Sequence, residues 1–185
     1  NEEATEQCQL YVCATLANLA KCKSKRTDMV NQGVLQPLVA WCSRSSLDAA
    51  VQHASDALRD LDQDDMSRSM LVQARYVESL VHMCKEDRNI DIVRNATDAL
   101  SQLAQKVHRR PELLKAGVIR PLLRLCYTVS DLQVLVSATS VFQYLSCDAS
   151  CKPHLLAEPL VLQSFVKMCA IAQDREVMMS ILGTL

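Results

Sequence analysis

The sequence is poor in the residues that make turns and in aromatic residues. It has 3 glycines and 5 prolines, where average usage would place about 22 in a chain of 185 residues. Many short strands need such turn residues, so this scarcity counts against a sandwich, a barrel or a propeller. Only 4% of the residues are aromatic, whereas leucine, alanine and methionine are common. This composition predicts an all-α fold packed by aliphatic side chains.

Long apolar runs and an excess of one charge are also missing. No run approaches the roughly 18 to 20 residues of a membrane span, and the polar start has no signal-peptide core, so we expect no direct membrane insertion. The 20 basic and 21 acidic residues nearly cancel, which leaves no global field for nucleic acid, and we expect none as a partner. Apolar residues make up 49% of the chain, enough for a sizeable core.

The cysteine content indicates a cellular compartment. An odd count of 9 in a helical chain fits a reducing compartment better than a disulfide framework. We therefore predict an intracellular protein, with the cytoplasm as the first choice and the nucleus as the alternative. The sequence begins with Asn1 rather than methionine, and we expect it to be an excerpt of a longer chain.

An internal repeat organises the sequence. Similar segments end in leucines that recur with a period of about 42 residues, and the last interval is slightly shorter than the others. These leucines are Leu19, Leu61, Leu103, Leu145 and Leu185. A second series with the same period consists of Cys42, Cys84, Cys126 and Cys169. One cysteine per stacked unit would lie roughly 10 Å from the next, so we interpret the series as small core residues rather than metal ligands.

The periodicity inside each unit is helical. The longest predicted helix repeats an apolar stripe with spacing i, i+3, i+7 and i+10. Its three full copies are Val51, Ala54, Leu58 and Leu61, then Val93, Ala96, Leu100 and Leu103, then Leu135, Ala138, Phe142 and Leu145. Two shorter helices precede it in the unit, and Gly33 and Gly117 fit a sharp turn between them, which Ala74 and Pro159 must make differently.

These features resemble armadillo repeats: three helices in about 42 residues, with the turn formed by residues 31–39 and 115–123. We predict one array over residues 1–185. Its parts are a partial repeat at 1–23 and repeats at about 24–62, 63–105, 106–148 and 149–185. The resemblance implies a right-handed α-solenoid whose longest helices line a concave groove that binds other proteins.

The residues expected in this groove lie opposite the buried stripe, because a residue two positions away points about 200° around a helix. The predicted groove consists of Tyr11, Asn18, Gln52, His53, Asp56, Asp60, Arg94, Asn95, Asp98, Gln102, Ser137, Ser140 and Tyr144. Import adaptors of the armadillo family carry a Trp and an Asn four residues apart at the equivalent positions. This chain has Ala14, Asp56, Asp98 and Ser140 in place of the Trp, and only Asn18 keeps the Asn.

Acidic side chains dominate the centre of the predicted groove. Clustered carboxylates in a concavity favour a partner segment with a basic or donor-rich anchor, and an ordinary solvated helix face is the alternative interpretation. Two basic loops, at residues 21–26 and 106–110, suit phosphate or an acidic partner, but they lack interleaved aromatic residues and are interpreted as solvated loops.

No pattern indicates catalysis, a cofactor or a metal. The four histidines are scattered, the three glycines form no phosphate loop, and neither Cys8 with Cys13 nor Cys147, Cys151 and His154 completes a zinc set. We predict a non-catalytic scaffold or adaptor that binds a partner protein segment along the groove. A regulatory arm of a larger protein, autoinhibitory or oligomerising, is the alternative, and a nuclear-import cargo adaptor is a third hypothesis. Self-association is compatible with each of them.

Overall fold

The structure, a computed structural model, describes residues 2–44, 47–63, 70–71, 74–84 and 88–171. Every regular element in these ranges is a helix. The chain divides into two compact units, Asn1–Met83 (unit 1) and Cys84–Leu185 (unit 2), and each is considered by itself. The predicted fifth leucine position, Leu185, lies outside the described residues.

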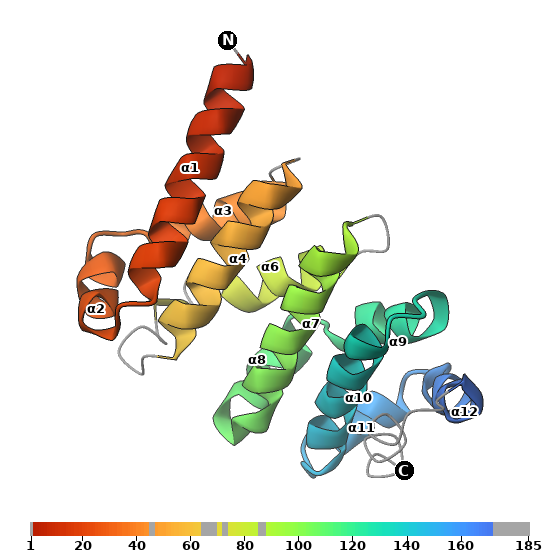
Figure 1. The fold of residues 1–185 in the computed structure, drawn as a ribbon. Helices are drawn as coiled ribbons and strands as arrows, with labels where there is room; N and C mark the ends of the chain where they lie inside the picture. Colours follow the sequence, from red (N-terminus) through yellow and green to blue (C-terminus); the bar gives the residue numbers. More distant parts are fainter. Residues whose placement is uncertain (1, 45–46, 64–69, 72–73, 85–87, 172–185) are drawn as a thin grey trace. The chain divides into compact units, whose positions relative to one another are not determined.

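Unit 1 contains α1 (Glu2–Ala20), α2 (Lys23–Asn31), α3 (Leu35–Arg44), α4 (Asp48–Asp62) and α6 (Tyr76–Met83). The two longest of these helices, α1 and α4, pack side by side, and α3 contacts both α4 and α6 (Figure 1). The order of a short helix, a second helix after Gly33 and a long third helix matches the predicted repeat.

Unit 2 begins with a long helix and then repeats the order of short, second and long helix. It contains α7 (Ile90–Gln105), the 3₁₀ turn η2 (Val107–Arg109), α8 (Arg110–Lys115), α9 (Ile119–Thr128), α10 (Leu132–Ser146), α11 (Lys152–Leu156) and α12 (Val161–Ile171). The set α8, α9 and α10 is complete, and α11 and α12 begin the next set. The long helices α7 and α10 lie side by side, and α9 packs against both α10 and α12 (Figure 1).

The apolar stripes predicted for the long helices form the core. All twelve residues of the three predicted copies are less than 5% exposed, which confirms the helical register read from the repeat. Each fully buried Leu or Phe contributes about 1.5–3 kcal/mol relative to an exposed side chain. Leu19 differs from the other leucines of its series, because its side chain is 48% exposed on α1.

A row of small polar residues accompanies the apolar stripe. Ser55, Thr97 and Thr139 recur with the period of the repeat and are all buried. Each hydroxyl donates to a carbonyl of its own helix, as in the 2.9 Å bond from Thr97 Oγ1 to the oxygen of Val93. The burial of these hydroxyls therefore leaves no donor unsatisfied.

The turns before the second helices confirm one prediction and correct another. Gly33 and Gly117 have φ of +80° and +73°, in the left-handed region that glycine tolerates. The prediction assigned the corresponding turn of the next repeat to Ala74, but the residue with positive φ there is Arg75, at +61°. Arg75 lies one repeat period from each glycine, so the repeat register imposes this conformation on a residue with a side chain.

The cysteine series is part of the core in three of its four positions. Cys42, Cys84 and Cys126 are buried, and burial raises the pKa of Cys84 and of Cys126 to about 12. Cys169 is partly exposed. Thiols in this environment stay protonated near neutral pH and pack as small apolar side chains.

Candidate functional site

In unit 1, the polar face of α4 carries most of the residues predicted to bind a partner. Gln52, His53, Asp56 and Asp60 all retain exposed surface, opposite the buried stripe that begins at Val51. One turn separates the two aspartates, so their carboxylates lie on the same side of the helix. We call these four residues the α4 strip.

The two carboxylates of the α4 strip differ in their surroundings. Asp56 Oδ1 lies 2.9 Å from Arg59 Nη2 in an ion pair within the helix, and both side chains remain more than a quarter exposed. The Asp60 carboxylate has no side-chain partner among the residues that the structure describes. Among the described residues, a cationic group would therefore displace no side-chain partner of Asp60.

Helix α1 contributes the other predicted residues of unit 1. Tyr11 is exposed, and Asn18 is exposed with its Oδ1 accepting a 3.1 Å hydrogen bond from Lys21 Nζ. Both side chains are accessible on a helix that packs against α4.

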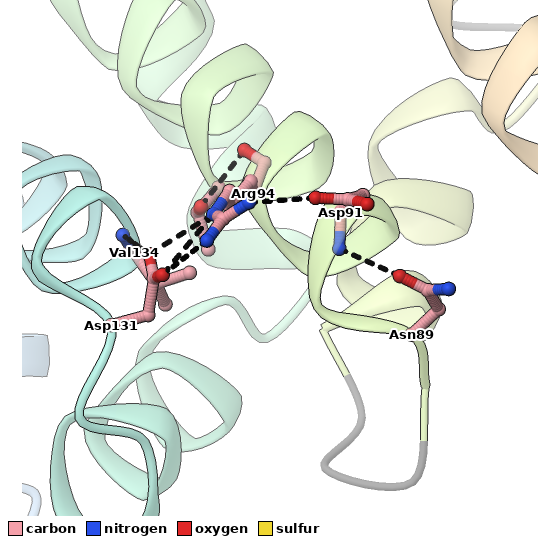
Figure 2. A network of polar contacts seen from close by, with 6 residues as sticks. Asn89, Asp91, Arg94, Asp131 and Val134 are labelled. Atoms are coloured by element: carbon pink, nitrogen blue, oxygen red, sulfur yellow. Dashed lines mark hydrogen bonds and ion pairs between the residues drawn. The ribbon is translucent and has the colours of Figure 1, made fainter.

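In unit 2, Arg94 belongs to a polar network rather than to an open surface. Its Nε lies 3.2 Å from both oxygens of Asp131, and its Nη1 lies 2.7 Å from Asp91 Oδ1 (Figure 2). Asp131 is the N-cap of α10 and also accepts a 3.1 Å hydrogen bond from the backbone N–H of Val134. We call this arrangement the Arg94–Asp131 brace, because it ties α7 to the start of α10.

The brace also changes the acidity of its carboxyl group. The hydrogen bonds from Arg94, together with the one from Val134, lower the pKa of Asp131 below its usual value, although partial desolvation opposes them. The hydrogen bond to Asp131 in turn raises the pKa of Arg94. The sequence contained an indication of this role, since an aspartate that precedes a helix is a strong N-cap candidate.

The remaining predicted residues of α7 are half-buried or exposed. Asp98 Oδ2 accepts a 3.1 Å hydrogen bond from Gln102 Nε2 one turn later, and Asn95 is half-buried. The amide of Gln102 is neutral, so this hydrogen bond brings no opposite charge to Asp98.

Helix α10 corrects one predicted position. Ser140 and Tyr144 are half-buried, but Ser137 is only 7% exposed and does not belong to an accessible face. The prediction assumed a narrow buried stripe with an exposed face opposite it, whereas α10 packs against α7, α9 and α11 and is buried over a wider arc. Each unit therefore carries some of the residues predicted for the groove, and Ser137 is buried rather than accessible.

The arginines of the two basic loops are buried, whereas the sequence predicted solvated loops. Arg26 and Arg110, which stand two repeat periods apart, are both buried, and their Nε atoms donate to the carbonyl oxygens of Ala20 and Ala104 at 2.7 and 2.9 Å. Each arginine thereby satisfies a carbonyl at the end of a long helix. Arg109 is also buried, with Nη1 3.2 Å from Glu112 Oε2. The interpretation of these arginines as solvated is wrong, because all three are buried and two of them, Arg26 and Arg110, bind carbonyls at the ends of helices.

Neither a metal-binding cluster nor a membrane-spanning helix is present among the described residues. Within those ranges, no group of three or more His, Cys, Asp or Glu side chains is arranged to hold a metal ion. Among the same residues, no helix combines the length and apolar character needed to cross a bilayer.

Comparisons with known proteins show the fold. No family model and no curated protein sequence matches the chain. Among solved structures, an engineered protein superposes with a TM-score of 0.80 at 20% identity, over 96% of this chain and 73% of the other. A designed armadillo repeat protein in complex with the peptide (KR)4 superposes with a TM-score of 0.77 at 18% identity, over 93% and 72%. The chain has an armadillo-repeat-like, all-α solenoid fold.

A third similar structure belongs to the same class. It is one of the computationally designed armadillo repeat proteins for modular peptide recognition, with a TM-score of 0.78 at 20% identity, over 93% of this chain and 72% of the other. The resemblance stated from the repeat is thereby confirmed at the level of the fold.

Proposed function

We propose that this armadillo-repeat-like chain is a non-catalytic interaction scaffold that binds an extended basic segment of a partner protein, with the α4 strip of unit 1 as the principal contact. The single observation that carries the proposal is the pair of carboxylates on one side of α4, of which Asp60 has no side-chain partner among the described residues. Exposed carboxylates at this spacing suit lysine or arginine side chains of an extended peptide.

The similar structures support the choice of partner chemistry. One of the designed armadillo repeat proteins was solved with a peptide of alternating lysine and arginine, (KR)4. In this chain, the exposed Tyr11 and Asn18 on α1, which packs against α4, offer further polar contacts within unit 1. We assign Asn18 a smaller contribution, because it already has a hydrogen-bond partner.

The test measures binding of the synthetic peptide (KR)4 to the folded chain by isothermal titration calorimetry. The double variant Asp56→Asn/Asp60→Asn should weaken binding about tenfold, because an exposed charge pair contributes about 0.2–1 kcal/mol and each decade of Kd is about 1.4 kcal/mol. Binding to the unmodified chain should also weaken as salt is added.

Asp28→Asn is the matched control. Asp28 is an exposed aspartate on α2 that pairs with Lys25 at 3.3 Å, so its replacement removes a unit of negative charge away from the α4 strip. We expect this control to bind (KR)4 nearly as well as the unmodified chain. Equal weakening by Asp28→Asn and by an Asp60→Asn single variant would show nonspecific attraction, and would contradict the proposal.

A further inference from the structure

Each unit contains a cleft between two second helices of the repeat, outside the strips already described. The cleft of unit 1 lies between α3 and α6, and the cleft of unit 2 lies between α9 and α12. Their volumes are similar, about 670 and 620 Å³. The two clefts occupy the same part of the repeat, so their linings can be compared position by position.

The side chains on the two clefts differ sharply. Gln36, Ala40 and Ser43 line the cleft of unit 1, and two repeat periods later the cleft of unit 2 has Arg120, Arg124 and Tyr127. Two neutral residues are thus replaced by arginines and a serine by an aromatic residue. The cleft of unit 2 is therefore more basic and more aromatic than the equivalent cleft of unit 1, so packing of the repeat does not require these side chains.

Two exposed apolar side chains line the α9–α12 cleft, and one of them, Tyr127, is contacted by a lysine. Tyr127 and Leu160 are 46% and 56% exposed, and Leu123 lies beside them in the lining. Lys167 Nζ is 3.7 Å from the centroid of the Tyr127 ring and donates a 2.9 Å hydrogen bond to the Tyr127 carbonyl oxygen. This contact fixes the tyrosine ring and adds a cation next to the cleft.

The charges around the α9–α12 cleft are mostly positive. Arg120 Nε donates to both carboxylate oxygens of Glu158, at 2.9 and 3.0 Å, and the Arg120 side chain is still 80% exposed. Arg124 lines the cleft and Lys167 lies at its tyrosine, so the described residues around the cleft include three cations and the carboxylate of Glu158. This balance favours a ligand that brings negative charge.

A buried hydroxyl in the lining supplies an independent indication of a ligand. Ser164 is 1% exposed, and its Oγ has no hydrogen-bond partner among the described residues. The corresponding residue of unit 1, Ser79, is also buried, but its Oγ donates a 2.7 Å hydrogen bond to the Tyr76 carbonyl oxygen. A buried hydroxyl without a partner is costly, and a polar group of a ligand relieves that cost.

We propose that the α9–α12 cleft is a second docking site, which binds an acidic peptide segment of a partner protein. An aromatic or leucine side chain of the peptide packs against Leu123, Tyr127 and Leu160, and carboxylates next to it pair with Arg120 and Arg124. The site is distinct from the α4 strip, which has the opposite charge and lies in unit 1.

The test begins with a phage-displayed library of twelve-residue peptides selected on the intact chain. Selected peptides should combine an aromatic or leucine residue with adjacent Asp or Glu, and one of them, labelled with fluorescein, serves as the probe for Kd by anisotropy. The triple variant Arg120→Gln/Arg124→Ala/Tyr127→Ser copies the residues of unit 1, so each change is already accommodated at the equivalent position of this chain. We expect it to weaken binding of the probe at least tenfold.

Two controls make the result specific. Ala40→Glu changes the cleft of unit 1 and should leave Kd of the acidic probe unchanged, and binding of (KR)4 should be the same in the triple variant as in the unmodified chain. Circular dichroism confirms that the variants keep their helicity. Failure to select acidic peptides, equal binding by the triple variant, or self-association of the chain that the triple variant abolishes would each overturn the proposal.

Discussion

The α4 strip and the polar face of α7 occupy the same positions of the repeat with different side chains. Gln52 and Asp60 on α4 correspond to Arg94 and Gln102 on α7, each one repeat period later. On α7, Arg94 is bound to Asp91 and Asp131, whereas Asp60 has no side-chain partner among the described residues. The same set of positions thus ties two helices together in unit 2 and, in unit 1, includes a carboxylate without a side-chain partner among the described residues.

The helix pairs of the two units show why the brace is confined to unit 2. In the α1–α4 pair, Leu10 and Leu47 hold the positions that Arg94 and Asp131 hold in the α7–α10 pair. Leu47 is the N-cap of α4 and gives no side-chain cap, whereas Asp131 caps α10. Two differences between otherwise equivalent helix pairs therefore account for the brace.

The largest expected effect concerns the core, where the two units should be alike. Leu58→Ala in unit 1 and Leu100→Ala in unit 2 each remove a fully buried side chain at the same repeat position, and each should lower the free energy of unfolding by about 2–5 kcal/mol. Urea denaturation followed by circular dichroism measures the loss. If either variant lowers the free energy of unfolding by less than about 1 kcal/mol, the cores of the two units are not equivalent at this position.

The next effect distinguishes unit 2 from unit 1. Asp131→Ala removes a helix cap and an ion pair, and should lower the free energy of unfolding by about 1–2 kcal/mol at pH 7. Asp131→Asn keeps an oxygen for the Val134 N–H, so we expect a smaller loss. A double-mutant cycle with Arg94→Leu should give a coupling of about 0.5–1 kcal/mol, and a coupling near zero would show that the brace does not stabilise the fold.

The same carboxyl group predicts a pH dependence. Arg94 lowers the pKa of Asp131 in the folded chain, so folding favours the ionised form. The contribution is fully present above the unfolded pKa of about 3.9 and is lost as pH falls through the lowered folded pKa. The difference in stability between the unmodified chain and Asp131→Asn should therefore be constant from pH 7 to about pH 5 and shrink below about pH 4. A difference that persists unchanged at pH 2 would contradict this account.

The smallest effect concerns the turns, which differ between the units in residue type but not in register. Gly117→Ala in unit 2 should cost about 1 kcal/mol, because φ is +73° and no atom within 4 Å would clash with the added Cβ. Arg75→Gly in unit 1 should have the opposite sign and stabilise by about 0.5–1 kcal/mol, because it relieves a left-handed arginine. Thermal unfolding of both variants measures the two shifts, and the same sign for both would refute the explanation.

The sequence predicted the features that repeat and missed those that do not. The period of the repeat located buried residues such as Val51, Leu100 and Phe142, because one packing solution recurs in every unit. It could not locate the Arg94–Asp131 brace, which depends on side chains from two helices that are far apart in the chain. The burial of Ser137 was missed for a related reason, since it depends on how many neighbours surround α10.

Glycine-based recognition of the turns was similarly incomplete. Searching for glycine identified the turns at Gly33 and Gly117. In the repeat between them the turn has no glycine, and the prediction chose Ala74 instead of Arg75. Counting the repeat from Gly33 would have found the correct position. Counting by the repeat period would also have shown the unusual composition of the α9–α12 cleft. Arg120 and Tyr127 occupy the positions that Gln36 and Ser43 occupy in unit 1.

Carboxyl footprinting with the (KR)4 peptide tests most directly whether the α4 strip is the open binding surface. Carbodiimide labels accessible carboxylates, and mass spectrometry reads the labelling of each aspartate with and without the peptide. We predict strong protection of Asp60, clear protection of Asp56 and none of Asp28. Protection of Asp28 to the same extent as Asp60, or no protection of Asp60 at saturating peptide, would contradict the assignment of the binding surface to α4.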